Sequence, residues 1–362
     1  MNKTIINSAI LFLIIVTLFS CEKRNNEVED ATNPEDFTVY FPSNTTTTWE
    51  TIATEDLGWN TNEVENLNSF LENSGTKGFI VLYKGRVVIE EYYNDHDALK
   101  NWYWASAGKT LTTAVVGIAQ EEGFLSINDK VSDYLGLGWT SLTEEKENLI
   151  TIKHLLSMSS GLDDTQGDAT DSENLIYTAD AGTRWAYHNV YVLLQDVVAN
   201  ATNETWRNYL NDKLRDKIGM SGTFIALGSL NVFWSNTRSM ARFGLLTASN
   251  GNWDNTQIIS ENYITEATSA SQNINLSYGY LWWLNGKESY HLPQSQLTFQ
   301  GSLIPNAPDD MYCALGKNDQ KIYIVPSKDL VIVRMGETGA EENFALSSYD
   351  DDLWERINAV ID

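Results

Sequence analysis

Runs of apolar residues near the two ends of the chain have the period of β-strands. Residues 79–83 and 87–93 are rich in Val, Ile and Tyr and flank Lys84-Gly85-Arg86, which predicts a β-hairpin. Residues 321–325 and 330–334 surround a Pro-containing turn and predict a second hairpin. We therefore expect an α+β fold, with one antiparallel sheet built from both chain ends and flanked by helices.

Helical periodicity dominates the middle of the chain. From Ser106 to Glu122 an apolar stripe recurs every three to four residues, and Gly123 ends it. Residues 152–158 and 190–201 predict further helices, and 352–361 an amphipathic helix at the C-terminus. The pattern indicates a mostly helical subdomain, over about residues 110–275, inserted into the sheet domain.

The first residues have the pattern of a signal peptide. Lys3 precedes an uncharged apolar run at 9–19, which is too short to span a bilayer comfortably. The run ends in Ser20-Cys21 before a polar stretch, and this junction resembles the bacterial lipoprotein box, in which the Cys is lipidated. The resemblance implies a signal peptide (1–20), a flexible tether (21–50) after lipidated Cys21, and a folded domain (51–362). The protein would then be exported and held at a bacterial membrane by its lipid alone; the alternative is a buried N-terminal helix.

Composition excludes several classes of function. The formal net charge of -25 and the lack of a basic run argue against nucleic-acid binding. Only Cys21 and Cys313 are present, so no disulfide framework is expected. The spacings typical of zinc and calcium sites are missing, and the acidic stretch 163–168 is interpreted as a solvated loop. We predict neither a metal site nor a cofactor.

A serine and a lysine stand one helical turn apart at the start of the helix predicted from residue 106. Residues i and i+3 share a helix face, so the Lys109 amine can lie beside the Ser106 hydroxyl as its base. The positive end of the helix and the Ser106 N–H can stabilise an oxyanion. We expect burial to lower the pKa of Lys109. The structural alternative is an N-cap at Ser106 and a solvated Lys109.

The same tetrapeptide spacing occurs a second time, at Ser74-Gly75-Thr76-Lys77. This copy lies in a Gly-containing loop before the first predicted strand, where nothing holds the two side chains together. We expect it to be an inert surface segment.

Two further groups of polar residues can serve a cleft. Tyr187 and Asn189 stand two residues apart just before a predicted helix, although packing and helix capping are the alternative roles. Lys317 begins the segment 317–320, which leads into a predicted strand, and its cation can bind a carbonyl or carboxylate substrate. Its alternative role is that of a charge at a strand edge that prevents aggregation. Trp185, Trp282 and Trp283 are candidates for an aromatic cleft wall.

The chain resembles the serine β-lactamase and DD-peptidase superfamily in the order of three motifs. These are Ser106-x-x-Lys109, then Tyr187-x-Asn189, then a Lys-led triplet. The similarity is strongest to class C β-lactamase-related esterases and 6-aminohexanoate-dimer hydrolases, and it covers about residues 55–360. It implies a β-lactamase-like fold and cleavage of a small-molecule ester, amide or peptide through an acyl-enzyme.

The resemblance also implies a role for each residue. Ser106 would be the nucleophile and Lys109 its base, while Tyr187 would carry the proton to the leaving group. Asn189 would orient the substrate and Lys317 would set the charge of the cleft. The oxyanion hole would combine the backbone N–H groups of Ser106 and Gln320.

The third motif departs from the family pattern, because Asp319 stands where Gly is usual. If residues 317–319 continue a strand, Asp319 shares the cleft-facing side with Lys317 and disfavours anionic substrates such as β-lactams. Two other functions stay open: a β-lactamase or DD-peptidase acting on cell-wall peptide, and a catalytically silent surface binding module of the same fold.

Overall fold

The computed structural model describes residues 37–340 and 346–362, and Thr38–Asp362 form one compact unit. The predicted signal peptide (1–20) and Cys21 lie outside the described residues. Residues 38–49 pack on the domain: the Trp49 indole donates to Gly85 O, and Arg242 donates to the carbonyls of Pro42 and Ser43. The folded part therefore begins earlier than the boundary near residue 50 that composition suggested.

The main sheet has six antiparallel strands in the order β2-β1-β13-β12-β11-β8. The N-terminal hairpin, β1 and β2, pairs through β1 with β13 from the C-terminal end, so both chain ends build the sheet as predicted. The strands are β1 (Thr76–Tyr83), β2 (Arg86–Tyr92), β8 (Trp283–Leu284), β11 (Tyr312–Gly316), β12 (Gln320–Val325) and β13 (Leu330–Gly336).

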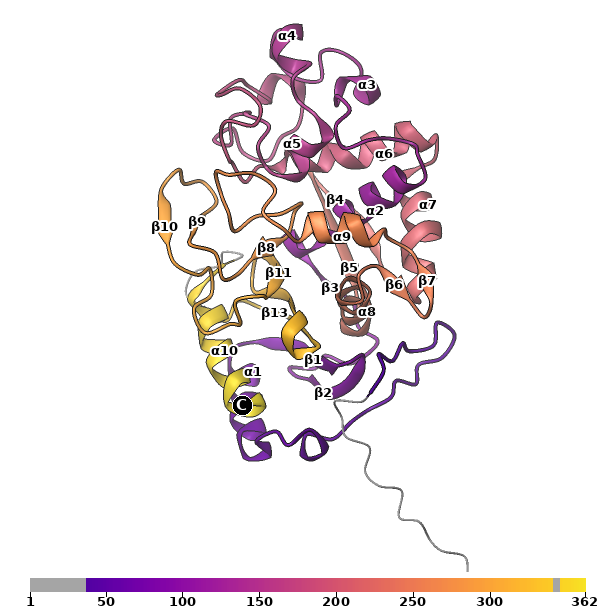
Figure 1. Cartoon of the computed structure of the whole chain (residues 1–362), viewed down its shortest axis with the longest axis vertical. Coiled ribbons are helices and arrows are strands. Elements are labelled where there is room, and N and C mark those ends of the chain that lie inside the picture. The colour runs from indigo at the N-terminus through magenta and orange to yellow at the C-terminus, as the bar shows by residue number, and fades with distance from the viewer. Residues whose placement is uncertain (1–36, 341–345) are drawn as a thin grey trace, which may run out of the picture. The chain divides into compact units, whose positions relative to one another are not determined.

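Helices cover both faces of this sheet (Figure 1). On one face α8 (Thr237–Ala248) lies so close that a Cβ on Gly244 would come within 2.5 Å of the Val331 side chain. On the other face α10 (Ser348–Ile361) packs Trp354 against Tyr323, and α1 (Val64–Asn73) lies beside α10 through Phe70 and Tyr349. The predicted α+β arrangement, an antiparallel sheet built from both chain ends and flanked by helices, is confirmed.

The inserted subdomain is helical but also carries strands. Its strands β5 (Leu230–Ser235) and β4 (Thr223–Leu227) form a three-stranded sheet with β3 (Trp102–Tyr103), which precedes it, and β6 pairs with β7 in a short ribbon. A second ribbon, β9 with β10, follows the subdomain in the chain. The remaining helices are α2 (Lys109–Glu121), α3 (Ser132–Leu135), α4 (Glu144–Glu147), α5 (Ile152–Leu156), α6 (Leu194–Thr202), α7 (Trp206–Leu210) and α9 (Glu261–Ala267). The ribbon strands are β6 (Asn252–Trp253), β7 (Thr256–Gln257), β9 (Ser289–His291) and β10 (Thr298–Gln300).

Helix α2 runs through the interior of the molecule. Its residues are buried from Lys109 to Ala119, so the protein covers the whole circumference of the helix, including its threonines, and not only the apolar stripe expected from the sequence. Within residues 37–340 and 346–362, every helix is too short or too polar to cross a bilayer.

Candidate active site

The turn that precedes α2 is held tightly by its neighbours. Trp104 is fully buried, its N–H donates to Phe233 O at 2.8 Å, and its indole donates to Ser235 Oγ at 2.8 Å. Ala105 then adopts a φ of 46°, a left-handed conformation that costs a non-glycine residue free energy and recurs at functional sites. A short 3₁₀ helix, Ala105–Gly108, carries Ser106 directly into α2.

Ser106 and Lys109 meet as the i, i+3 spacing predicts. The Lys109 Nζ donates to Ser106 Oγ at 2.7 Å, and Lys109 is only 7% exposed. A buried amine in contact with a half-buried hydroxyl can take its proton, so this pair can generate a nucleophile.

Two phenol rings enclose the Lys109 amine. Its Nζ lies 4.7 Å from the ring centre of Tyr187 and 4.5 Å from that of Tyr191. Burial by itself lowers the pKa of Lys109, but Tyr187, Tyr191 and Asp168 favour the charged form and the net pKa is raised. The expectation of a lowered pKa for Lys109 is therefore wrong, because the fold brings partners to the amine that outweigh the effect of burial.

Tyr187 is held by a cluster of aromatic side chains. Its ring stacks on Trp283 at 5.8 Å between centroids and meets Tyr278 edge-on at 6.1 Å, while Trp185 packs behind at 6.3 Å. Trp185, Trp282 and Trp283 are almost fully buried, so their predicted place in the cleft wall is wrong. Trp185 and Trp283 instead support Tyr187.

Asn189 begins the 3₁₀ helix Asn189–Leu193 and joins two loops. Its Nδ2 donates to Asp168 O at 2.7 Å and to Ser229 O at 3.0 Å. Both amide protons are thereby used within the protein, and the Oδ1 atom is left as an acceptor for a donor on the substrate.

A cavity of about 280 Å³ unites five of the six predicted catalytic and substrate-binding residues. Neither its lining nor the rest of the described chain contains three or more His, Cys, Asp or Glu side chains grouped as metal ligands. The lining residues are Ala105, Ser106, Lys109, Asp168, Tyr187, His188, Asn189, Tyr191, Leu230, Asn231, Val232 and Lys317.

The Lys-led segment lies in a turn, not on a strand as predicted. Residues 317–319 connect β11 to β12, and Asn318 and Asp319 both have left-handed φ values, 60° and 58°. Gly316, at the end of β11, lies against the Ser106 turn: a Cβ there would be 2.4 Å from Trp104 O and 3.0 Å from Ala107 N. The close contact brings Lys317, which is exposed, to the cavity.

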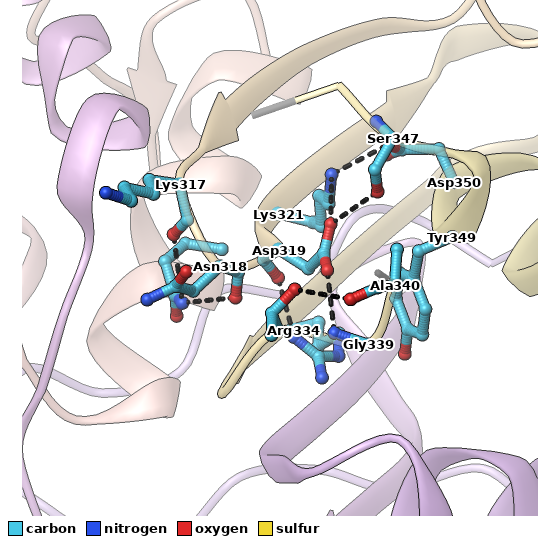
Figure 2. Close-up of polar contacts among 12 residues, drawn as sticks. Lys317, Asn318, Asp319, Lys321, Arg334, Gly339, Ala340, Ser347, Tyr349 and Asp350 are labelled. Carbon is cyan, nitrogen blue, oxygen red and sulfur yellow. Dashed lines mark hydrogen bonds and ion pairs between the residues drawn. The ribbon is translucent and has the colours of Figure 1, made fainter. Parts of the chain in front are cut away.

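Asp319 points away from Lys317 and toward Lys321, Gly339 and Ser347, so its predicted place beside Lys317 is also wrong (Figure 2). The side chain is fully buried, and its carboxylate accepts from Gly339 N at 2.8 Å and from Ser347 Oγ at 2.9 Å. It also lies 3.1 Å from Lys321 Nζ, which in turn donates to Asp350 at 2.7 Å. A turn reverses the chain within three residues, so the strand alternation behind the prediction does not apply.

Gln320 is buried behind the same turn and does not line the cavity. Its side-chain amide donates to Asn318 O and Gly336 O, both at 2.7 Å, and so braces the turn. The predicted oxyanion role concerns its backbone N–H, which belongs to the residue paired with Gly316 across the hairpin. That role stays a prediction.

The second Ser-x-x-Lys copy has no such geometry. Ser74 Oγ donates to Leu71 O and contacts the Tyr349 hydroxyl, while Lys77 Nζ donates to Asn94 O. The two side chains have separate partners, so this copy provides a matched control for experiments on Ser106.

Several cavity residues were not foreseen from the sequence. Tyr191 follows Tyr187 by four residues and lies in the 3₁₀ helix Asn189–Leu193. Asp168, Leu230 and Val232 come from a loop and a strand far apart in sequence, and no local pattern marks them. His188 is buried beside them; neither of its ring nitrogens has a hydrogen-bond partner, and burial lowers its pKa.

Comparison with known proteins shows the family and the fold of this chain. The model of the family described as Beta-lactamase matches residues 70–347, which is most of the chain. The chain belongs to the beta-lactamase family. No curated protein sequence matches it.

Solved structures of this family's fold resemble it at low sequence identity. A protein of Bacillus anthracis named as a candidate 6-aminohexanoate-dimer hydrolase has a TM-score of 0.67 and 17% identity, over 88% of this chain and 89% of its own. A class C beta-lactamase from Rhodobacter sphaeroides has a TM-score of 0.60 and 17% identity, over 82% and 100%. The hydrolase EstCE1, described as having promiscuous acyltransferase activity, has a TM-score of 0.64 and 13% identity, over 85% and 99%.

Proposed function

We propose that this protein is a serine hydrolase that cleaves an ester or amide through an acyl-enzyme on Ser106. The observation that carries the proposal is the 2.7 Å contact between Ser106 Oγ and Lys109 Nζ in a cavity that also contains Tyr187. Family membership supports the same chemistry.

The reaction follows from where protons can move. Ser106 Oγ transfers its proton to Lys109 Nζ as it bonds to the substrate carbonyl carbon. When the tetrahedral intermediate collapses, the bond to the leaving group breaks and that group takes a proton from Tyr187, which is restored from Lys109. Water then attacks the acyl carbon and gives a proton to the same pair; the bond from the carbon to Ser106 Oγ breaks, Oγ takes that proton back, and the acid product leaves.

The raised pKa of Lys109 limits this pathway near neutral pH. Even a lysine of ordinary pKa is neutral in only about one molecule in 2,500 at pH 7. The base form of Lys109 is scarcer still, because Tyr187, Tyr191 and Asp168 favour the ammonium. The rate should therefore increase as the pH rises.

Backbone N–H groups near Ser106 are suited to the developing oxyanion. One belongs to Ser106 itself, at the positive end of the helix that continues as α2. We propose that the second comes from the Gly316–Lys317 end of β11, because Gly316 lies against the Ser106 turn whereas Gln320 is one strand further away.

Asn189 and Lys317 are proposed to bind substrate. The Oδ1 of Asn189 can accept a hydrogen bond from the substrate, and Lys317 supplies a cation at the exposed end of the cavity. Because Asp319 does not offset this cation, it gives no reason to expect that anionic substrates are disfavoured. β-Lactamase or DD-peptidase activity is therefore the second candidate, and turnover of nitrocefin or release of D-alanine would favour it.

The N-terminal pattern adds a proposal about location. We propose that the chain is exported and anchored to a bacterial membrane through lipid on Cys21, on the strength of the apolar run at 9–19 and the residues that end it.

Hydrolysis of nitrophenyl acetate tests the proposed function. We expect wild type and Ser74→Ala to release nitrophenol at equal rates and Ser106→Ala to lose the activity. Equal activity in Ser106→Ala would contradict the proposal, and no turnover of esters, amides or β-lactams by wild type would favour a silent binding module.

A further inference from the structure

We infer that the outward face of the β4–β5 hairpin binds an aliphatic acyl chain, so that the enzyme prefers acyl groups longer than acetyl. The inference rests on the proposed function, because it names the substrate class of the same site. It concerns four residues of the hairpin: Ile225, Leu227, Leu230 and Val232.

Strand register places these four side chains on one face. Ile225 pairs with Val232 and Leu227 pairs with Leu230, and directly opposed residues of an antiparallel pair point the same way. Phe224 and Phe233, which also oppose each other, lie on the other face and are buried toward the core. The protein therefore covers the side of the hairpin that carries Phe224 and Phe233, whereas Ile225, Leu227 and Leu230 on the opposite side are exposed.

Apolar side chains on the uncovered face are exposed to solvent. Ile225 is 42% exposed, Leu227 51% and Leu230 36%. Single exposed apolar residues are ordinary, but adjoining ones beside a cavity mark a surface that binds something apolar. The two cross-strand pairs are two residues apart, so the face extends about 7 Å along the hairpin.

Two observations identify substrate as the occupant. Leu230 and Val232 line the same cavity as Ser106, so the apolar face is continuous with the site of chemistry. The hairpin tip is also tied to that site, because Asn189 Nδ2 donates to Ser229 O at 3.0 Å. Tyr187, the proposed proton donor to the leaving group, comes from a different segment of the cavity lining, which leaves the β5 side for the acyl group.

A chain-length series tests the inference directly. The measurement is kcat/KM for nitrophenyl acetate, butyrate, hexanoate and octanoate with wild type and with the double variant Ile225→Gln, Leu227→Gln. Each methylene that contacts a half-exposed face should raise kcat/KM about twofold, roughly half the free energy of a fully buried methylene. The octanoate-to-acetate ratio should therefore be tenfold or more in wild type.

The double variant should lower this ratio at least fivefold while leaving acetate hydrolysis unchanged, because glutamine keeps the size of the side chains but not their apolar character. Leu137→Gln is the matched control, since Leu137 is 59% exposed in a loop outside the hairpin and does not line the cavity. It should behave as wild type throughout.

The outcomes separate this inference from the proposed function. If ester hydrolysis depends on Ser106 but kcat/KM does not change with acyl chain length, the inference is overturned and the proposed function is not. Absence of any Ser106-dependent hydrolysis overturns the proposed function. If the double variant instead changes the oligomeric state in gel filtration, or binding to phospholipid vesicles, with no change in the ratio, the face binds another protein copy or a lipid surface and the inference is wrong.

Discussion

Replacing Asp319 by Asn should destabilise the fold far more than the same change at Asp329. Both residues lie in turns between neighbouring strands of the main sheet and have left-handed φ values, 58° and 52°, which Asn tolerates as well as Asp. They differ in surroundings: Asp319 is fully buried, whereas the Asp329 side chain is 51% exposed and lies 3.7 Å from Lys84.

The size of the effect follows from the contacts of each carboxylate. Asp319 accepts from Gly339 N and Ser347 Oγ and lies 3.1 Å from the buried Lys321 amine. Hydrogen bonds to charged groups contribute about 1.5–3 kcal/mol each, and an amide replaces these only in part. Lys321 keeps Asp350 at 2.7 Å, so its charge is not left unpaired. We expect the free energy of unfolding to fall by about 3 kcal/mol.

The Asp329→Asn control should lose less than about 1 kcal/mol, as exposed ion pairs do. Urea denaturation of wild type and both variants measures the difference, provided that the slopes of the transitions agree. Equal losses, or an unchanged midpoint for Asp319→Asn, would refute the view that a buried carboxylate holds this turn.

Three substitutions and one pH profile test the site and the anchor. Lys109→Arg should keep the fold but lower kcat/KM about a hundredfold or more, since arginine stays protonated; near-normal turnover would indicate another base. In wild type, kcat/KM should climb through the alkaline range, because the raised pKa of Lys109 delays formation of the neutral amine; a pH profile already level at neutrality would argue against this base. Gly316→Ala should abolish ester hydrolysis, because its Cβ would meet Trp104 O at 2.4 Å; unchanged activity would separate β11 from the oxyanion site. Cys21→Ser should move the protein from the detergent phase to the aqueous phase, unless wild type already partitions to water.

Local patterns were sufficient for the sheet hairpins and for the central pair of the site. Residues 79–83 and 321–325 alternate or cluster apolar residues as strands do, and β1 and β12 contain them. The contact between Ser106 and Lys109 depends only on the geometry of a single helical turn, and that geometry arises wherever a helix begins. The inert copy at Ser74 could be set aside for the same reason, since no helix begins there.

Long-range contacts account for what the sequence did not indicate. The environment of Asp319 comes from Gly339, Ser347 and Lys321, and that of Lys109 from Tyr187 and Tyr191; neither set is visible as a local spacing.

The turn at residues 317–319 does have a local sequence signal. Asn318 and Asp319 are consecutive residues of the two types that favour turns and tolerate left-handed φ values, which outweighs the tendency of the neighbouring strands to continue.

Intact-mass spectrometry after treatment with a fluorophosphonate tests the central claim most directly. Nucleophilic attack by Ser106 predicts a single phosphonyl adduct in wild type and in Ser74→Ala, and none in Ser106→Ala. Because the probe reacts only with an activated hydroxyl, Lys109→Arg should slow the labelling without changing its site. An adduct that persists in Ser106→Ala would contradict the account.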